Sequence, residues 1–252
     1  MTQDVLPGCE AYSADGGPHG VLVLHGITGN PSSMRSLAQR FAAAGYGVEL
    51  PRLPGHGTSI EDMLTTDWSD WSGEALRAFD ALAARSDKTA VVGLSMGGAL
   101  AALVAEQRPG VAACVFINAV VNQQPPEVLT LIDEALAGGM TVFETGEGSD
   151  VRKEGVEENA YPGWPLAPLK SLQENLPAVK AALGSIRAPS LVLTSREDHT
   201  VPPENSLELM ADLAGPVEHL WLEDSYHVAT IDNDQELVES TALSFVDRVL
   251  GA

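Results

Sequence analysis

Short apolar runs alternate along this chain with longer segments whose apolar residues recur at helical spacing. Runs of this length that are rich in β-branched residues are typical of buried strands. They lie at residues 21–24, 48–50, 90–92, 114–117, 191–193 and 217–222. Because strands that alternate with helices form parallel sheets covered on both faces, we predict an α/β fold with a mostly parallel central sheet.

The segments between these strands carry the spacing of amphipathic helices. We predict helices at residues 33–44, 67–84, 97–107, 169–183, 204–213 and 235–250. A chain of 252 residues buries one large core but leaves little room for a second full domain. We therefore expect residues 1–252 to form a single domain.

One stretch, at about residues 120–168, interrupts the alternation of strands and helices. It contains a proline pair, a glycine pair and an acidic loop. Within it a helix is predicted, because apolar residues follow the spacing i, i+3, i+4, i+7 and i+8 at Val128, Leu131, Ile132, Ala135 and Leu136. We interpret the stretch as a small inserted cap. An apolar helix face there fits a lid over a lipophilic pocket and, equally, ordinary packing onto the body.

Composition limits the classes of partner. The chain has 14 basic and 35 acidic residues, which give a formal net charge of −21. Such a charge repels phosphate backbones and anionic lipid surfaces, so we expect no nucleic-acid partner. It favours neutral or cationic substrates over anionic ones. Solubility alone also accounts for an excess of acidic residues.

The location of the protein and the state of its cysteines are also predicted. No apolar run is long enough for a membrane helix, and the first ten residues, MTQDVLPGCE, lack the pattern of a secretory signal. We therefore expect a cytoplasmic protein without stable membrane insertion. A chain of this size does not depend on one disulfide, so we expect Cys9 and Cys114 to be free thiols.

Residues 90–98, AVVGLSMGG, are an apolar run that ends in Gly-x-Ser-x-Gly and continues into a stretch of small residues. This order predicts a nucleophile elbow, a sharp strand-to-helix turn that projects Ser95 toward a base and backbone donors. Gly93 and Gly97 flank the serine where side chains would collide. The pentapeptide alone also fits a structural turn, but the strand before it and the helix after it favour a nucleophile.

A serine nucleophile needs a general base, and catalytic groups of parallel sheets gather beyond the carboxyl ends of the strands. Of the six histidines, His227 follows the last predicted strand in a loop and is the preferred base. An imidazole that accepts the serine proton needs a carboxylate to fix its tautomer. Asp198 follows the preceding strand and fits this role, with Glu197 as its nearest competitor. We assign turn or loop roles to His56 and His199.

The tetrahedral intermediate of acyl transfer needs hydrogen-bond donors where its oxyanion forms. Two backbone N–H groups are candidates. One belongs to Met96, directly after the nucleophile, and the other to Ile27, in the loop LHGITG after the first strong strand. His25 either shapes that loop for the oxyanion or belongs to a plain strand-to-helix connection.

The order Ser95, Asp198, His227 is that of α/β-hydrolases. Within them, nearly the whole chain resembles bacterial monoacylglycerol lipases and closely related small carboxylesterases. The likeness lies in segments that keep the family's order and similar gaps: LHGITGNPSSMRSLA, GYGVELPRLPGHGTSIEDM, GLSMGG, EDHTVPP and SYHVATID. The resemblance implies an α/β-hydrolase fold with Ser95 as nucleophile, Asp198 and His227 as its partners, and Ile27 and Met96 as oxyanion donors.

Two departures from the family pattern bear on substrate choice. The family commonly has an aromatic residue where Ile27 stands, which leaves the N–H intact but changes the pocket wall. The segment EENAYP resembles the family segment whose acidic residue faces the polar head of a monoacylglycerol, which maps to Glu158. From the residues alone we prefer to interpret Glu158 as part of a solvated acidic run, because such runs usually face water.

The resemblance implies a serine ester hydrolase for monoacylglycerols or other lipophilic carboxylic esters, working through an acyl-enzyme. We expect no cofactor and no metal. A carboxylesterase for short acyl chains is one alternative, and a non-catalytic protein that binds an apolar ligand is another. A dehalogenase is disfavoured because it would carry an aspartate at position 95.

Overall fold

The central feature of the computed structural model, which describes residues 4–144 and 149–251, is a seven-stranded sheet. The strand order is β1-β3-β2-β4-β5-β8-β9, and every neighbouring pair is parallel except β1 and β3. The strands are β1 (Tyr12–Ala14), β2 (His19–Leu24), β3 (Gly47–Leu50), β4 (Lys88–Leu94), β5 (Val111–Ile117), β8 (Ser190–Ser195) and β9 (Val217–Leu222). The predicted α/β class with a mostly parallel sheet is confirmed.

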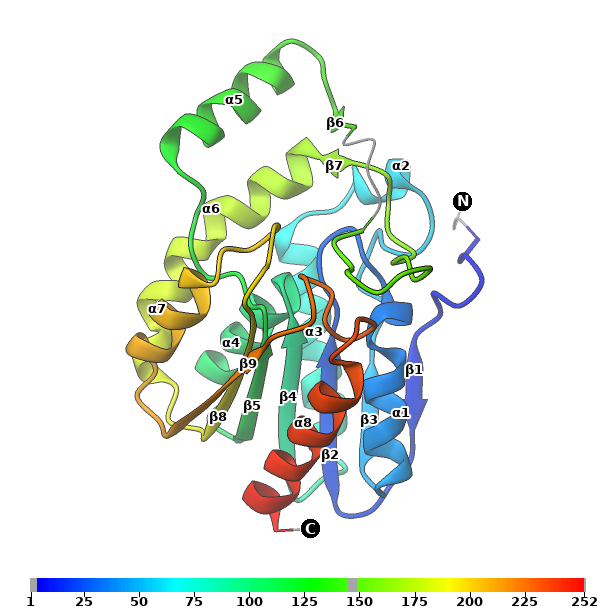
Figure 1. The fold of residues 1–252 in the computed structure, drawn as a ribbon, viewed down its shortest axis with the longest axis vertical. Coiled ribbons are helices and arrows are strands. Elements are labelled where there is room, and N and C mark those ends of the chain that lie inside the picture. The colour runs from blue at the N-terminus through cyan, green and yellow to red at the C-terminus, as the bar shows by residue number, and fades with distance from the viewer. Residues whose placement is uncertain (1–3, 145–148, 252) are drawn as a thin grey trace.

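Helices cover both faces of the sheet (Figure 1). One face packs against α1 (Arg35–Ala43) and α8 (Gln235–Leu250). The other packs against α3 (Trp68–Ala83), α4 (Met96–Gln107), α6 (Leu166–Ala182) and α7 (Glu204–Asp212). Shorter elements are the 3-10 helices Pro31–Met34 and Leu183–Ser185 and the helix α2 (Ile60–Met63).

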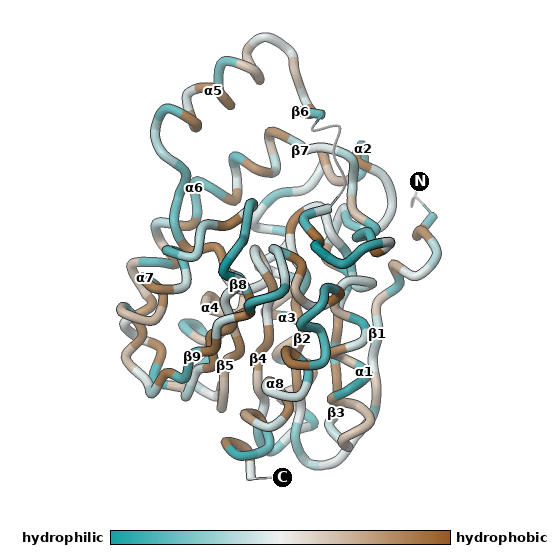
Figure 2. Tube along the Cα trace, viewed as in Figure 1, coloured by the Kyte–Doolittle hydropathy of each residue, from teal (hydrophilic) through white to brown (hydrophobic). Residues whose placement is uncertain are grey.

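The two hydrophobic cores follow from the alternation of side chains along each strand. In β2, Leu22 and Leu24 join the core under α3 and α4, whereas Val21 and Val23 join the core under α1 and α8. All four side chains are fully buried. A strand that is apolar on both faces suits the middle of a helix-covered parallel sheet, and Figure 2 shows apolar residues gathered in the central strands.

The elbow after β4 is shaped by close packing of small residues. Side chains at Gly93 and Gly97 would collide with backbone atoms of Gly97 and Leu24, and one at Gly98 would collide with Ala119. Only a residue without Cβ allows these approaches. The sheet, the turn and α4 are therefore held together at the point where Ser95 emerges.

The segment between β5 and α6 lies outside the seven-stranded sheet. It holds α5 (Pro126–Ala137) and a two-stranded antiparallel ribbon of β6 (Val142–Phe143) and β7 (Trp164–Pro165). Figure 1 places these elements beyond the carboxyl ends of the parallel strands. The predicted helix is present, but Leu131 was placed wrongly on its inward face. Its side chain is 63% exposed, whereas Ile132 is 7% exposed.

Several elements differ from the sequence prediction for identifiable reasons. The helix predicted at residues 33–44 is divided into a 3-10 turn that begins at Pro31 and the helix α1. The edge strand β1 was missed, because it has three residues and none of them is fully buried. Strands β6 and β7 have two residues each, too few for a period of two to be visible.

Candidate active site

Four of the predicted site residues follow the carboxyl ends of parallel strands. Ile27 follows β2, Ser95 follows β4, Asp198 follows β8 and His227 follows β9. Such loops meet at one edge of a parallel sheet, which is where α/β proteins bind ligands.

Ser95 occupies a strained turn between β4 and α4. Its backbone has φ 56° and ψ −120°, a conformation that residues other than glycine rarely adopt. The Ser95 N–H donates to the Ile117 carbonyl (3.0 Å), and the Ser95 carbonyl accepts from the N–H groups of Gly98 (2.9 Å) and Val120 (3.2 Å). These bonds hold the turn, and the serine is only 6% exposed.

Asp198 and His227 form a buried pair. Nδ1 of His227 lies 2.8 Å from Oδ2 of Asp198. The histidine side chain is 8% exposed and the aspartate side chain 1%. The second carboxylate oxygen of Asp198 accepts the N–H groups of Thr200 (2.9 Å) and Val201 (2.7 Å). The backbone of the β8–α7 loop thus fixes the carboxylate that faces the imidazole. Glu197, the competing carboxylate, is exposed and 3.9 Å from Arg152.

The environment of His227 favours a protonated imidazole. Burial alone would lower its pKa, but the charge of Asp198, the hydrogen bond to it and the charges of Glu158 and Asp150 raise the pKa above its ordinary value. An imidazole with a carboxylate on Nδ1 keeps Nε2 available to take and return a proton.

Ser95 and His227 line the same cavity, which has a volume of about 820 Å³. No hydrogen bond joins the Ser95 hydroxyl to the His227 ring, although both lie in the described part of the chain. The wall is mixed: apolar side chains such as Ile27, Val128 and Ile132 face the same space as carboxylates. The cavity therefore offers room and an apolar surface beside the serine.

The loop after β2 presses against the serine. A Cβ placed on Gly26 would lie 3.3 Å from Cβ of Ser95 and 3.7 Å from its hydroxyl oxygen. Among the described residues, neither the Ile27 N–H nor the Met96 N–H donates a hydrogen bond to another group. Two backbone donors without partners thus come from the two segments that meet at Ser95.

Glu158 lines the cavity and does not lie on an open acidic face. It is half-buried, and its carboxylate lies against Gly29 of the loop after β2. Burial raises its pKa, while the nearby His227 and the Ser33 hydroxyl act in the opposite direction. This position favours a role in the cavity over the preferred interpretation of Glu158 as part of a solvated acidic run.

Residues 21–240 match the Alpha/beta hydrolase family. The chain belongs to this family.

Curated relatives of this α/β-hydrolase cover almost its whole length. A thermostable monoacylglycerol lipase of Bacillus sp. (strain H-257) is 39% identical over 250 residues, which are 98% of each chain. A carboxylesterase of Bacillus subtilis (strain 168) is 27% identical over 240 residues, 94% of this chain and 96% of the esterase.

Solved structures agree with the family. One chain, from a study of LipS and LipT, two metagenome-derived lipolytic enzymes, is 42% identical with a TM-score of 0.90 and covers 97% of this hydrolase and 100% of itself. A monoacylglycerol lipase of Paleococcus ferrophilus, 20% identical with a TM-score of 0.70, shares the fold over 94% of this chain and 98% of its own. Across residues 4–144 and 149–251 of the hydrolase, none of the helices combines the length and apolarity needed to cross a membrane.

His25 and His56 have structural positions in this hydrolase. Nε2 of His25 accepts the Leu53 N–H (3.1 Å), so its Nδ1, 2.9 Å from the Gly26 carbonyl, carries the proton. Burial, with the neighbouring His56, keeps the pKa of His25 well below its ordinary value. Nδ1 of His56 lies 2.9 Å from the Pro54 carbonyl, as a turn-stabilising role predicts. Both cysteines are free, as expected.

Sequence reasoning missed Asn118, which follows β5 with φ 43°. Its amide accepts the Ser195 N–H (2.8 Å) and donates to the His227 carbonyl (2.7 Å), so it joins the end of β8 to the loop that carries His227. A polar residue directly after a buried strand was a visible signal. Asp150 and Asp232, which also hold this loop, have no such signal, because they lie in irregular segments.

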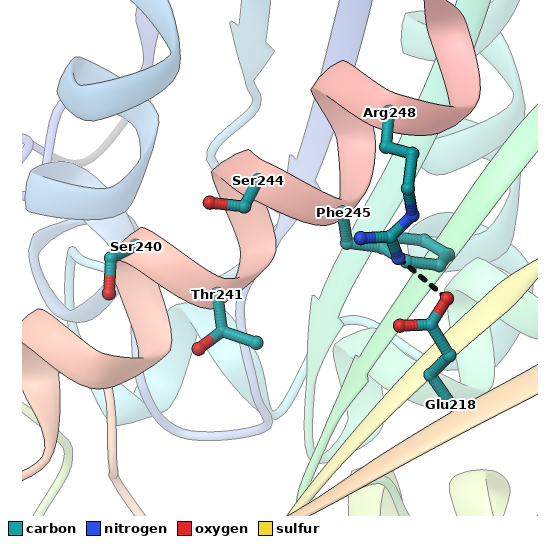
Figure 3. Close-up of a pocket in the computed structure, with 6 residues that line it drawn as sticks. All are labelled: Glu218, Ser240, Thr241, Ser244, Phe245 and Arg248. Atoms are coloured by element: carbon teal, nitrogen blue, oxygen red, sulfur yellow. Dashed lines mark hydrogen bonds and ion pairs between the residues drawn. The ribbon is translucent and has the colours of Figure 1, made fainter.

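A second hollow, of about 240 Å³, lies between β9 and α8 and differs in chemistry. Figure 3 shows its hydroxyl groups and the ion pair between Glu218 and Arg248, at 2.6 Å. The hollow has neither a histidine nor a serine on a strained turn among its lining residues. The cavity that Ser95 and His227 line is therefore the better candidate for ester hydrolysis.

Proposed function

We propose that this chain is a serine ester hydrolase that cleaves monoacylglycerols or similar lipophilic carboxylic esters. Ser95 is the nucleophile, His227 the general base and acid, and Asp198 its carboxylate partner. The backbone N–H groups of Ile27 and Met96 form the oxyanion hole. Carboxylic ester hydrolysis is the reaction type of the monoacylglycerol lipase and carboxylesterase relatives.

One observation carries this proposal: His227, which is in buried contact with Asp198, lines the same cavity as the serine of the strained turn. The carboxylate fixes the tautomer of the histidine and stabilises the imidazolium, so the imidazole can already act as a base. The serine hydroxyl and the Nε2 atom come together when substrate binds, since catalytic hydrogen bonds of unliganded enzymes are often long.

The proposed reaction has two halves. Ser95 Oγ attacks the ester carbonyl while its proton passes to Nε2 of His227, and the two backbone N–H groups stabilise the oxyanion. His227 then gives the proton to the departing alcohol, which leaves Ser95 acylated. A water molecule repeats the sequence on the acyl-enzyme and releases the carboxylic acid.

The walls of the cavity support a lipophilic acyl chain. Val128 and Ile132 of α5 line the cavity from the segment outside the sheet. We assign residues 120–168 to a cap over the cavity within a single domain of residues 1–252. Burial of acyl methylene groups against such side chains is worth about 0.8 kcal/mol each.

Glu158 supports recognition of the alcohol part. A carboxylate that lines the cavity beside the catalytic residues accepts hydrogen bonds from hydroxyl groups, and a monoacylglycerol offers two of them. No lysine or arginine lines the cavity, which consists of described residues only, so an anionic head group lacks a partner.

Replacement of the nucleophile tests the proposal. Ser95→Ala should lower the hydrolysis of a monoacylglycerol by roughly 10⁴-fold or more, since removal of one triad member leaves only oxyanion and binding effects. Labelling by a fluorophosphonate should disappear as well. The measurements are titrimetric rates and mass spectrometry of the labelled protein.

The matched control is Ser244→Ala, which removes a hydroxyl from the second hollow. This variant should keep both labelling and turnover. Substantial turnover by folded Ser95→Ala would overturn the assignment of the nucleophile.

A further inference from the structure

Asp150 joins the segment outside the sheet to the loop that carries the catalytic carboxylate. Its Oδ1 lies 2.8 Å from Nδ1 of His199, and its Oδ2 accepts the His199 N–H at 2.9 Å. The Thr200 hydroxyl adds a longer contact of 3.4 Å. One carboxylate thus holds the two residues that directly follow Asp198.

The same residue holds the loop of the catalytic base. Oδ2 of Asp150 accepts the His227 N–H at 3.4 Å, and its backbone carbonyl accepts the Val228 N–H at 3.1 Å. The Asp150 side chain is only 15% exposed. It lines the cavity together with His199 and His227. Asp150 is therefore in contact with both loops of the Asp198–His227 pair and with the cavity.

A different buried carboxylate anchors the neighbouring backbone. Asp232 accepts the N–H groups of Arg152 and Lys153 on one side and of Tyr226 on the other, each at 2.8 Å. It fastens the chain just after Asp150 to the chain just before His227. Asp232 therefore helps to hold the chain that carries Asp150 against the loop that carries His227.

We propose that Asp150 is a positioning residue that sets both the placement and the charge environment of the base, His227. This inference rests on the proposed function, because it takes His227 to be the base. Asp150 touches no substrate in this role; it acts through the backbone of His227 and through its own negative charge.

The charged groups that face His227 come from two segments of the chain. Asp198 lies in the β8–α7 loop, and Glu158 and Asp150 lie in the segment outside the sheet. The nearest titratable neighbour of Asp150 itself is His199, whose pKa is raised by the hydrogen bond to Asp150. The charge of Asp150 is one of the causes that raise the pKa of His227. Loss of that charge makes the imidazolium less stable.

The test is the pH profile of kcat/KM for Asp150→Asn, because His227 acts as a base only when it is neutral. The acid limb should move to lower pH by roughly half to one unit. The plateau at high pH should fall several-fold, because a base that is misplaced by a fraction of an ångström transfers the proton less well. KM should change less than kcat.

Three further variants separate charge from geometry. Asp150→Glu keeps the charge on a longer side chain, so its acid limb should stay near that of the wild type while its plateau falls. His199→Gln removes the compensating imidazole and leaves the carboxylate, so its acid limb should not move to lower pH. Asp224→Asn removes an exposed charge close to the same loop, and both limb and plateau should match the wild type.

Each profile is normalised to active sites counted with a fluorophosphonate, and folding is checked by thermal unfolding. An unchanged acid limb in folded Asp150→Asn, or a loss explained entirely by fewer folded molecules, would overturn the inference. If Asp150→Asn does not fold, the Asp150→Glu and His199→Gln arms decide: an acid limb that moves down in both overturns it. Turnover that persists in Ser95→Ala refutes the proposed function instead.

Discussion

At the scale of single residues, strain and hydrogen bonds are concentrated where chemistry is proposed. Ser95 holds a conformation that costs about 1–3 kcal/mol for a residue with a side chain. Its surroundings offset that cost with four backbone hydrogen bonds, one from its N–H and three to its carbonyl. The hydroxyl is thereby lifted out of the turn toward the cavity rather than into the first turn of α4.

Glu158 gives a prediction at this scale. Glu158→Gln should lower the ratio of kcat/KM for a monoacylglycerol to that for the methyl ester of the same acid by roughly 3–30-fold. The reason is that hydrogen bonds to a charged group are stronger than those to a neutral amide. The ratio is the proper readout, because any change in His227 affects both substrates alike.

The neighbouring Glu157→Gln is the matched control for this ratio, since Glu157 also lines the cavity but is exposed. It should leave the ratio close to that of the wild type. If the two variants change the ratio equally, Glu158 has no special part in recognition of the alcohol.

The sequence predicted the positions of some site residues better than others. Ser95 and Asp198 each follow a buried apolar strand, His227 follows the half-buried strand β9, and strand ends meet at one edge of a parallel sheet. Glu158 was reached only through the family resemblance. Asp150 could not be predicted, because its partners lie 49 and 77 residues away in sequence and no local pattern marks it.

At the scale of elements, α5 is the helix whose inward face was predicted in part wrongly. It is also the element that we expect to determine the preferred length of the acyl chain. Ile132→Ala should lower kcat/KM for a long-chain monoacylglycerol by roughly 5–30-fold, because it removes apolar surface from the cavity wall. Hydrolysis of an acetate ester should be nearly unchanged. The measurement is a series of esters of graded acyl length.

Leu131 provides the control on the same helix turn. Its side chain is 63% exposed and does not line the cavity, so Leu131→Ala should show the same dependence on chain length as the wild type. A uniform fall for all esters in Ile132→Ala would indicate loss of folding or positioning instead of loss of acyl contacts.

Element prediction succeeded where burial imposes a pattern and failed where it does not. The central strands β2, β4 and β5 are almost fully buried, and their apolar runs are unambiguous. The face of α5 was misjudged because helical spacing alone does not tell which part of a wide apolar stripe meets the body. Tertiary contact with α6 and the cavity decides that Ile132 turns inward and Leu131 outward.

At the scale of the whole molecule, buried neutral histidines couple stability to pH. His25 and His56 are fully buried beside each other, with ring centroids 5.0 Å apart. Burial lowers the pKa of His56 to about 4. In the opposite sense, burial raises the pKa of the Glu106 carboxyl to about 7, which disfavours the folded state as pH rises. Maximal stability is therefore expected between these two titrations.

His56→Asn isolates the acid side of this dependence. The unfolded chain binds a proton at His56 below its ordinary pKa of 6.5, but the folded protein does so only near pH 4. Stability contributed by the neutral ring is thus present above pH 6.5 and is lost as pH falls, by about 1.4 kcal/mol per pH unit. Asparagine keeps a donor for the Pro54 carbonyl but does not titrate, so the slope of unfolding free energy between pH 6.5 and 4.5 should decrease by about that amount.

The slope separates this effect from lost packing, which lowers stability equally at every pH. His199→Gln should change the slope in the opposite direction and at higher pH, because the pKa of His199 is raised above 6.5. The stability that its protonation contributes is complete below pH 6.5 and is lost as pH rises through the raised pKa, so this variant should leave the slope between pH 6.5 and 4.5 unchanged. Urea unfolding of the three proteins at several pH values provides the comparison. If His56→Asn unfolds with the slope of the wild type, the His56 imidazole must already be protonated in the folded protein near pH 6. The acid sensitivity of the molecule must then come from its carboxylates, since 35 acidic residues stand against 14 basic ones.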